Sequence, residues 1–304
     1  MLANRLGEAQ SIKTDELGWV NPVYFVNSKY IIRFNARDIN LPKIPREAAA
    51  YKIMRDNGIP VPDFVLIDES KTISNYDYMV TKIISGENIE QSWNQLSKEQ
   101  RYSLSFQAGT LLRKIHSILN NSFGDLANNC PLAQVNKWSE YLDCKLRFRL
   151  DEAQDLKLFE DDIVKGIWTN FKSLVSVIDQ DTIPCFVHVD FHFGNMLHES
   201  DYIKSILDFE WSFWGDPLYD LCQIENLDET WPDSRDAFKK GYGLTEFDNT
   251  QILKIKLYQM IRNIELTIVA KRHFPESEAK EYLEITNKQI QSLKKSINPE
   301  LGYL

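Results

Sequence analysis

The apolar residues of this chain change their spacing near Ser85-Gly86, and this change constrains the fold more than any other feature. Before it, Val23–Val26 and Tyr30–Phe34 are short runs of β-branched and aromatic residues, which favour strands, and the turn-like Asn27-Ser28-Lys29 separates them. After it, apolar residues recur at helical spacing over residues 104–118. The sequence therefore predicts a small sheet-bearing part followed by a larger helical part.

The first part contains one helix and two further strands. A helix over residues 46–56 is closed by Asn57-Gly58, because glycine can adopt the left-handed conformation that ends a helix. Pro60 and Pro62 then require an extended chain, and residues 64–67 and 76–84 are strand candidates. We therefore expect residues 1–84 to form an N-terminal lobe and residues 85–304 a C-terminal lobe.

The second part is predicted to be mainly helical with a short island of strand. Ser97 and Gln100 form a capping box, and residues 257–268 and 282–293 have the spacing of amphipathic helices. Between these helices, residues 183–189 and 205–209 are apolar runs typical of strands. The predicted class is α+β, with a sheet-bearing lobe, a helical lobe and a short hinge.

Charge and composition limit the cellular setting. The formal charge of −9 argues against a nucleic-acid binder, whose affinity depends on basic surface. No apolar run is long enough to span a membrane, and the first ten residues lack the apolar core of a secretory signal. The four cysteines, Cys130, Cys144, Cys185 and Cys222, form no CxxC pair and are predicted to be reduced. We expect a cytoplasmic protein that is a monomer or a dimer.

The segments HVDFHFGNML and ILDFEWSFWGDPLYDL, residues 188–197 and 206–221, contain the informative motif. Asp190 ends an apolar strand, Asn195 follows across a tight turn, and Asp208 ends the next strand where a hairpin would return it alongside. An amide oxygen and a carboxylate suit Mg²⁺, and a second carboxylate can orient an attacking hydroxyl and accept its proton. The spacing D-x-x-x-x-N followed by D-F-x is that of a kinase catalytic loop and metal-binding triplet.

These segments resemble the signature of the aminoglycoside phosphotransferase and choline kinase family. The resemblance implies a bilobal protein-kinase-like fold, an ATP or GTP cofactor, and Mg²⁺. By position, it implies that Asp190 is the catalytic base and that Asn195 and Asp208 are the magnesium ligands. His188 resembles the residue that braces the loop, and Asp220 resembles a position that supports it.

The first lobe agrees with this resemblance in YIIRF and PREAAAYKIMRDNGIPVP. Arg33 stands where kinases commonly place a strand lysine on the phosphates, and its guanidinium presents a planar fork rather than a point charge. Glu47 on the following helix is its predicted partner, through a charge-assisted contact. The alternative is a surface ion pair, which would contribute little to stability.

The remaining nucleotide contacts also rest on the resemblance. GWVNPVYFV resembles the phosphate-side loop and hairpin of the family, although the loop ending at Asn21 is neither a GxGxxG sequence nor a Walker A sequence. Adenine is expected to hydrogen-bond the backbone of Thr81, Lys82 and Ile83, near the lobe junction.

Two other functions compete with a kinase. His188, Asp190 and His192 alternate along one strand face, as zinc ligands of a hydrolase could. That alternative must find further ligands among His116, His198 and His273, and it leaves Asn195 and Asp208 without a role. The other candidate is a pseudokinase that binds nucleotide without turnover.

The predicted substrate is a small cationic molecule. Acidic residues cluster after the motif, and Trp231 could add a cation–π or sugar-stacking face. Two alternatives remain for Glu210: it lines the metal site, or it faces solvent. The predicted substrate residues are Glu210, Glu225, Asp228, Glu229 and Trp231. An aminoglycoside antibiotic is the favoured acceptor, which would make this a resistance enzyme; choline, a macrolide and other amino or sugar alcohols are the alternatives.

Overall fold

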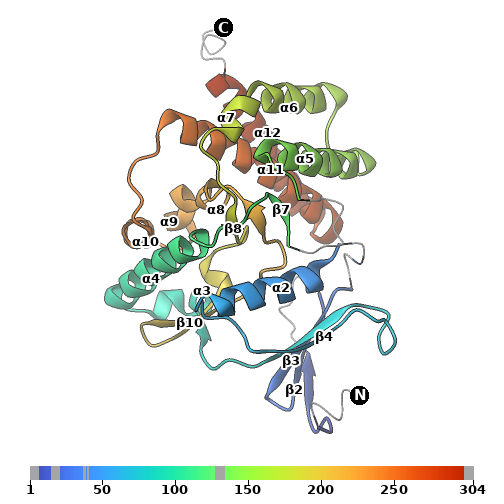
Figure 1. Ribbon diagram of the computed structural model, residues 1–304, viewed down its shortest axis with the longest axis vertical. Coiled ribbons are helices and arrows are strands. Elements are labelled where there is room, and N and C mark those ends of the chain that lie inside the picture. The colour runs from blue at the N-terminus through green and yellow to red at the C-terminus, as the bar shows by residue number, and fades with distance from the viewer. Residues whose placement is uncertain (1–6, 15–20, 37–38, 40, 127–133, 298–304) are drawn as a thin grey trace.

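The computed structural model describes residues 7–14, 21–36, 39, 41–126 and 134–297, and it has two lobes (Figure 1). The smaller lobe contains an antiparallel sheet in the order β1-β2-β3-β5-β4, and α2 lies between this sheet and the rest of the molecule. The bounds of these elements are β1 Ile12–Thr14, β2 Val23–Val26, β3 Tyr30–Phe34, α2 Lys43–Asp56, β4 Phe64–Asp68 and β5 Tyr78–Lys82.

The predicted hairpin and helix of this lobe are confirmed. β2 and β3 pair in antiparallel register with Val26 opposite Tyr30, as two apolar runs joined by a tight turn require. Helix α2 begins at Lys43 rather than at residue 46, because a proline at position 45 is tolerated within the first helical turn. The helix ends before Gly58, whose φ of 65° is left-handed.

The chain enters the larger lobe through a close backbone contact. Gly86 has a φ of 137°, and a Cβ atom there would lie 2.7 Å from the His198 carbonyl oxygen, so this position requires glycine. β6 (Glu87–Asn88) follows directly and pairs with β9 (Met196–Glu199). The predicted lobe boundary after residue 84 lies within this connection and stays a prediction.

The larger lobe is mainly helical and also contains two small three-stranded sheets (Figure 1). Its helices are α3 Ile89–Ser92, α4 Lys98–His116, α5 Trp138–Asp155, α6 Asp161–Ser173, α7 Val175–Asp179, α8 Leu218–Leu221, α9 Leu227–Thr230, α10 Arg235–Tyr242, α11 Asn249–His273 and α12 Glu276–Ile297. Short 3-10 turns cover Trp93–Gln95, Phe193–Asn195 and Ile224–Asn226. The capping box of Ser97 and Gln100 is confirmed at the start of α4.

The strand pairing around the motif differs from the prediction. β8 (Cys185–Val187) pairs with β11 (Phe213–Gly215), which also pairs with β7 (Gly124–Asp125), and β10 (Tyr202–Ile206) pairs with β9. The expected hairpin between the strands before Asp190 and Asp208 was therefore wrong. The chain makes a tight turn at Ser200, which pairs β10 with β9 and leaves β8 to a strand distant in sequence.

The described cysteines are free thiols: Cys185 and Cys222 are buried and Cys144 is exposed, whereas Cys130 lies outside the described residues. Within the described ranges, no helix is both long and apolar enough to cross a bilayer.

Candidate active site

Asp190 lies in a constrained loop directly after β8. Val189 before it has a φ of 77°, a conformation that costs a β-branched residue on the order of 1–3 kcal/mol. The loop is fixed by partners on both sides of this residue: the Val189 N–H donates to the Asp220 carboxylate at 2.6 Å, and the Arg262 guanidinium donates to the Val189 carbonyl. The strained residue therefore directly precedes Asp190 and sets the direction of its side chain.

The Asp190 carboxylate has three polar neighbours. Arg262 donates to Oδ1 at 3.1 Å, Asn195 Nδ2 donates to Oδ2 at 3.0 Å, and His192 Nε2 lies 3.4 Å from Oδ2. Burial would raise the pKa of Asp190, but the hydrogen bond and charge of His192 and the charge of Arg262 outweigh it and hold that pKa well below its ordinary value. The low pKa keeps this carboxylate ionised. One-third of the side chain is exposed, so it is also accessible.

Asn195 ends the turn that follows Asp190. Its Nδ2 donates to both the carbonyl and the carboxylate of Asp190, at 2.9 and 3.0 Å. This orientation leaves Oδ1, the atom suited to a metal, without a hydrogen bond to any described residue. The structure therefore brings Asn195 and Asp190 together as the sequence predicted.

Asp208 reaches the same loop through its neighbour Leu207. The Leu207 N–H donates to the Asn195 carbonyl at 2.8 Å, and the Leu207 carbonyl accepts from His188 Nε2 at 3.1 Å. Asp208 itself has a φ of 61°. Two backbone hydrogen bonds therefore place this carboxylate beside the Asp190 loop, although the strands before the two aspartates belong to different sheets.

The Asp208 carboxylate has the properties expected of a cation ligand. Its Oδ1 is buried without a hydrogen bond from the described residues, and its nearest guanidinium, Arg33, is 3.6 Å away. Burial and the charge of Glu210 raise the pKa of Asp208 to about 7, against the opposing effect of Arg33. Because a buried carboxylate oxygen without a partner is costly, this site suits Mg²⁺, which takes oxygen ligands.

His188 and Asp220 form a buried brace beneath the loop. Asp220 accepts from the His188 N–H at 2.8 Å and from His116 Nε2 at 3.0 Å. The His188 ring donates from Nε2 to the Leu207 carbonyl, and its Nδ1 accepts the Asp190 N–H at 3.2 Å. Burial lowers the pKa of His188, which is neutral with the proton on Nε2. These contacts place His188 and Asp220 directly against the Asp190 loop, and their supporting roles stay a prediction.

Arg33 joins the smaller lobe to the motif. Its guanidinium contacts the buried Glu47 carboxylate, the predicted partner, and also lies 3.3 Å from Glu210 Oε2. Tyr51 donates to Glu47 Oε1 at 2.7 Å. Burial raises the pKa of Glu47, and Arg33 and Tyr51 oppose that effect. The alternative of a surface ion pair is wrong for this contact, because Glu47 is fully buried.

Glu210 is buried in an ion-pair network rather than exposed to solvent. Lys43 at the start of α2 donates to Glu210 Oε1 at 2.8 Å, and Arg46 donates to the Glu210 carbonyl at 2.7 Å. Arg46 also contacts the Asp125 carboxylate on β7. Helix α2 therefore carries two buried cations, Lys43 and Arg46, onto the larger lobe, whereas Glu47 contacts Arg33 of the smaller lobe.

The structure leaves fewer backbone groups for the predicted adenine contacts, because several N–H groups there already have partners. The N–H groups of Lys82 and Ile83 donate to the carbonyls of Asp63 and Lys29, both at 2.9 Å, and Thr81 pairs within the sheet. An adenine ring would need carbonyl groups here or N–H groups of residues 84–86. Asn21 accepts the Ala36 N–H at 3.1 Å through its side chain, and Gly18, Trp19 and Val20 of the predicted phosphate-side loop lie outside the described residues.

Of the predicted substrate carboxylates after the motif, Glu225 and Asp228 already have partners. Glu225 lies 2.6 Å from Lys239 Nζ, and Asp228 accepts two backbone N–H groups at the start of α10, both at 2.9 Å. Glu229 is exposed. Trp231 lies close to the loop, because its ring stacks on His192 with centroids 5.8 Å apart. Of this cluster, the described contacts connect only Trp231 to the Asp190 loop.

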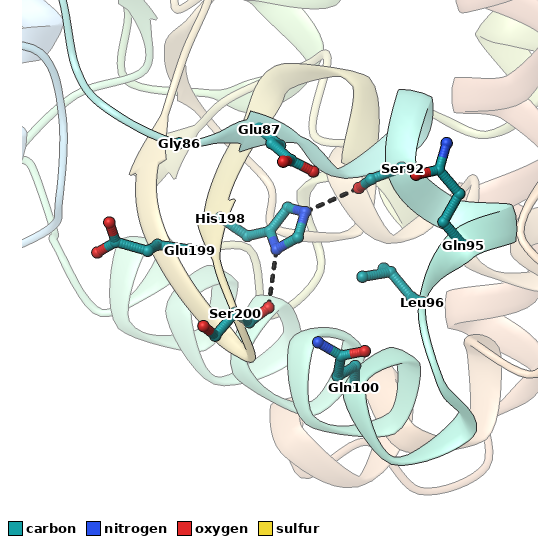
Figure 2. A pocket seen from close by; sticks show the side chains of 9 residues that line it. All are labelled: Gly86, Glu87, Ser92, Gln95, Leu96, Gln100, His198, Glu199 and Ser200. Atoms are coloured by element: carbon teal, nitrogen blue, oxygen red, sulfur yellow. Dashed lines mark hydrogen bonds between the residues drawn. The ribbon is translucent and has the colours of Figure 1, made fainter.

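The described residues offer no cluster of three or more His, Cys, Asp or Glu side chains able to bind a metal, as a zinc hydrolase would require. His188 uses both ring nitrogens within the protein. His116 on α4 is hydrogen-bonded to Tyr242 and Asp220 through its two ring nitrogens. Figure 2 shows His198 between Ser92 and Ser200, in a polar cavity of about 510 Å³ lined by none of the predicted site residues.

Sequence reasoning missed several residues around Asp190. Arg262 and Glu265 come from α11 and Arg149 from α5, and they line a cavity of about 150 Å³ together with Asp190. Nothing in the local sequence marks them, because each is a charged residue within an ordinary amphipathic helix. The helical spacing of apolar residues in α11 could have predicted that Arg262 and Glu265 lie next to its buried face. It could not have predicted that this face lies opposite Asp190.

A sheet-bearing lobe, a helical lobe and a carboxylate loop at their junction define a protein-kinase-like small-molecule phosphotransferase. The chain belongs to the phosphotransferase enzyme family, whose model matches residues 11–253. The fold class and the family resemblance predicted from the sequence are thus confirmed.

Solved structures share the fold of this chain, and curated proteins match part of its sequence. The ADP-bound aminoglycoside phosphotransferase APH(2'')-Ib is 19% identical with a TM-score of 0.68, and 97% of each chain is covered. The gentamicin complex of APH(2'')-IIa is 20% identical with a TM-score of 0.67, covering 97% of this chain and 94% of that one. Acyl-CoA dehydrogenase family member 11 of Rattus norvegicus is 24% identical over 264 residues, 82% of this chain. The chain spans 32% of that relative's length.

Proposed function

We propose that this protein transfers the γ-phosphoryl group of ATP or GTP to a hydroxyl group of a small molecule. The supporting observation is the Asp190 loop, where an ionised, accessible carboxylate is held by Arg262 and Asn195 beside Asp208, whose Oδ1 is buried without a hydrogen bond from the described residues. Phosphoryl transfer needs such positioning and charge more than covalent help from the protein. In this proposal residues 1–84 bind the nucleotide and residues 85–304 carry the catalytic loop.

Asn195 and Asp208 would bind Mg²⁺ through their side-chain oxygen atoms, of which Asp208 Oδ1 is buried without a hydrogen bond from the described residues. When bound, the ion neutralises phosphate charge. Asp190 orients the acceptor hydroxyl and accepts its proton, and Arg262 holds the carboxylate in position. Arg33, fixed by Glu47, is the proposed phosphate contact in the smaller lobe.

The predicted amine-bearing acceptor stays a hypothesis. In its favour, one solved neighbour is a gentamicin complex, and the indole of Trp231 lies near the loop. Glu225 and Asp228, however, are engaged with other groups. An assay with Mg-ATP or Mg-GTP and a panel of aminoglycosides, macrolides, choline, sugar alcohols and anionic alcohols tests the kinase proposal. Absence of acceptor-dependent ADP or GDP from every member of the panel would contradict it.

Substitution of the two aspartates separates their roles. Asp190→Ala should abolish turnover and leave nucleotide affinity within about threefold, because the carboxylate acts on the acceptor. Asp208→Ala should instead weaken the dependence of nucleotide binding on Mg²⁺. Turnover close to normal in the Asp190 variant would refute its assignment as the base.

A further inference from the structure

The cavity beside Asp190 borders a second cavity along α5. The first, of about 150 Å³, includes Asp190 and Arg262 in its lining, and the second, of about 320 Å³, is lined by α5 residues. Arg149 and Trp211 line both cavities. An acceptor whose hydroxyl is at Asp190 and whose body extends towards the second cavity would contact these two side chains.

The carboxylates that line the first cavity each have a cationic partner. Glu265 lies 2.7 Å from Lys145 Nζ and 2.9 Å from Arg149 Nε. Glu210 is bonded to Lys43, and Asp190 to Arg262. An ammonium group on the acceptor would have to compete with these buried cations, which favours an acceptor without a positive charge there.

Arg149 retains hydrogen-bond donors for a ligand. Its side chain is only 10% exposed; Nε donates to Glu265 and Nη1 donates to Glu152 at 2.7 Å. A guanidinium has five N–H donors, and the Nη2 group makes no hydrogen bond to a described residue. This planar edge suits the two oxygens of a carboxylate or phosphate group.

The space between Asp190 and Arg149 has an apolar wall. Leu266 and Val269 on α11 line the first cavity on one side, and the Trp211 ring contributes as well. Lys43 Nζ lies 4.2 Å from the centroid of that ring, which keeps the indole in place. An apolar body of a few carbon atoms is favoured against such a wall.

We propose that the acceptor is an alcohol that carries an anionic group on an apolar body, with its hydroxyl at Asp190 and its anion on Arg149. This inference rests on the proposed kinase function. The acceptor oxygen forms the new bond to the γ-phosphorus, the bond to the nucleoside diphosphate oxygen breaks, and the hydroxyl proton passes to Asp190.

Alcohols that differ only in charge test the inference. The probes are hydroxyalkanoates of increasing length, the matched diols, aminoalcohols and diol monophosphates, and kanamycin, each with Mg-ATP and with Mg-GTP. We expect kcat/KM for the anionic alcohols to exceed that of the diols about tenfold, corresponding to roughly 1.4 kcal/mol, with the aminoalcohols lowest. The carboxylate and phosphate probes distinguish the two possible anions.

The possible failures are distinct. If neither nucleotide binds, as followed by calorimetry, or if no probe releases ADP or GDP, the kinase proposal fails. If kanamycin or the aminoalcohols turn over at least as well as the anionic alcohols, the kinase proposal stands and the anionic acceptor is overturned.

Variants of Arg149 test whether this residue causes the preference for anionic alcohols. Arg149→Gln should reduce the ratio of kcat/KM for the anionic alcohol over the diol from about ten to about one. Arg149→Lys keeps the charge and should retain part of this ratio, and it serves as the readout if the glutamine variant does not fold. Arg113→Gln, an exposed arginine on α4, is the matched control. An unchanged ratio in both Arg149 variants would contradict the assignment.

Discussion

At the residue scale, the Asp190 loop is set by hydrogen bonds to the backbone on each side of one strained residue. Val189 keeps a positive φ because Asp220 binds its N–H and Arg262 binds its carbonyl. The same Arg262 reaches Asp190 Oδ1. A side chain from α11 thereby controls both the backbone and the carboxylate of the loop.

Arg262→Gln should lower kcat by about ten- to a hundredfold, because a small displacement of a reacting group costs on that order. The KM for nucleotide should change little, since Arg262 contacts neither Arg33 nor Asp208 in the structure. Arg262→Lys should recover part of kcat by keeping the charge near Asp190. Steady-state kinetics of both variants, with Lys271→Gln on the same helix as control, measure this split. Equal losses in kcat and in nucleotide affinity would argue for a general structural role.

At the element scale, α2 connects the lobes through charges rather than through an apolar face alone. Lys43, Arg46 and Glu47 are all buried, and their partners come from β3, β7 and the segment after Asp208. Buried ion pairs add little net stability when complete, but removing one partner is costly. The position of this helix therefore depends on the completeness of the network.

Arg46→Met should lower the free energy of unfolding by about 3–5 kcal/mol, because the Asp125 carboxylate then loses this guanidinium within the interior. Adding Asp125→Asn should restore part of the loss, since the remaining buried group is neutral. Urea unfolding of both variants provides the measurement, with Lys52→Met, an exposed lysine of the same helix, as control. A double variant less stable than the single one would contradict this account.

At the scale of the whole molecule, the acid stability depends on buried carboxylates held by cations. Glu265 connects α11 to α5 through Lys145 and Arg149. Burial would raise the pKa of Glu265, but the charges of Lys145 and Arg149 lower it from its ordinary value of 4.5 to about 2. Because the folded-state pKa lies below the unfolded one, this group stabilises the fold above pH 4.5.

The stabilisation by Glu265 should therefore be lost as the pH falls from 4.5 towards 2. The difference in unfolding free energy between the natural protein and Glu265→Gln should be largest above pH 4.5 and should shrink through this window. Chemical denaturation at a series of pH values measures it. A difference that stays constant with pH would show that the ionisation of Glu265 does not contribute.

Local signals determined the elements of the smaller lobe and the motif loop. The hairpin, α2 and the capping box of α4 follow from turn residues, capping residues and apolar spacing, which act within a few positions of the chain. The D-x-x-x-x-N spacing likewise brought Asp190 and Asn195 together, because five residues across a tight turn leave little freedom. These features could be predicted because their causes are near in sequence.

Only the tertiary structure decided which residues surround Asp190. The pairing of β8 with β11, the approach of Arg262 from α11 and the presence of Arg149 in the cavity all join segments far apart in the chain. The sequence predicted substrate carboxylates after the motif. In the structure Glu225 is paired with Lys239 and Asp228 accepts backbone N–H groups at the start of α10, and the cavity beside Asp190 is lined by paired charges instead. The physical reason is that a contact between distant segments depends on how whole helices pack, and no local pattern encodes that packing.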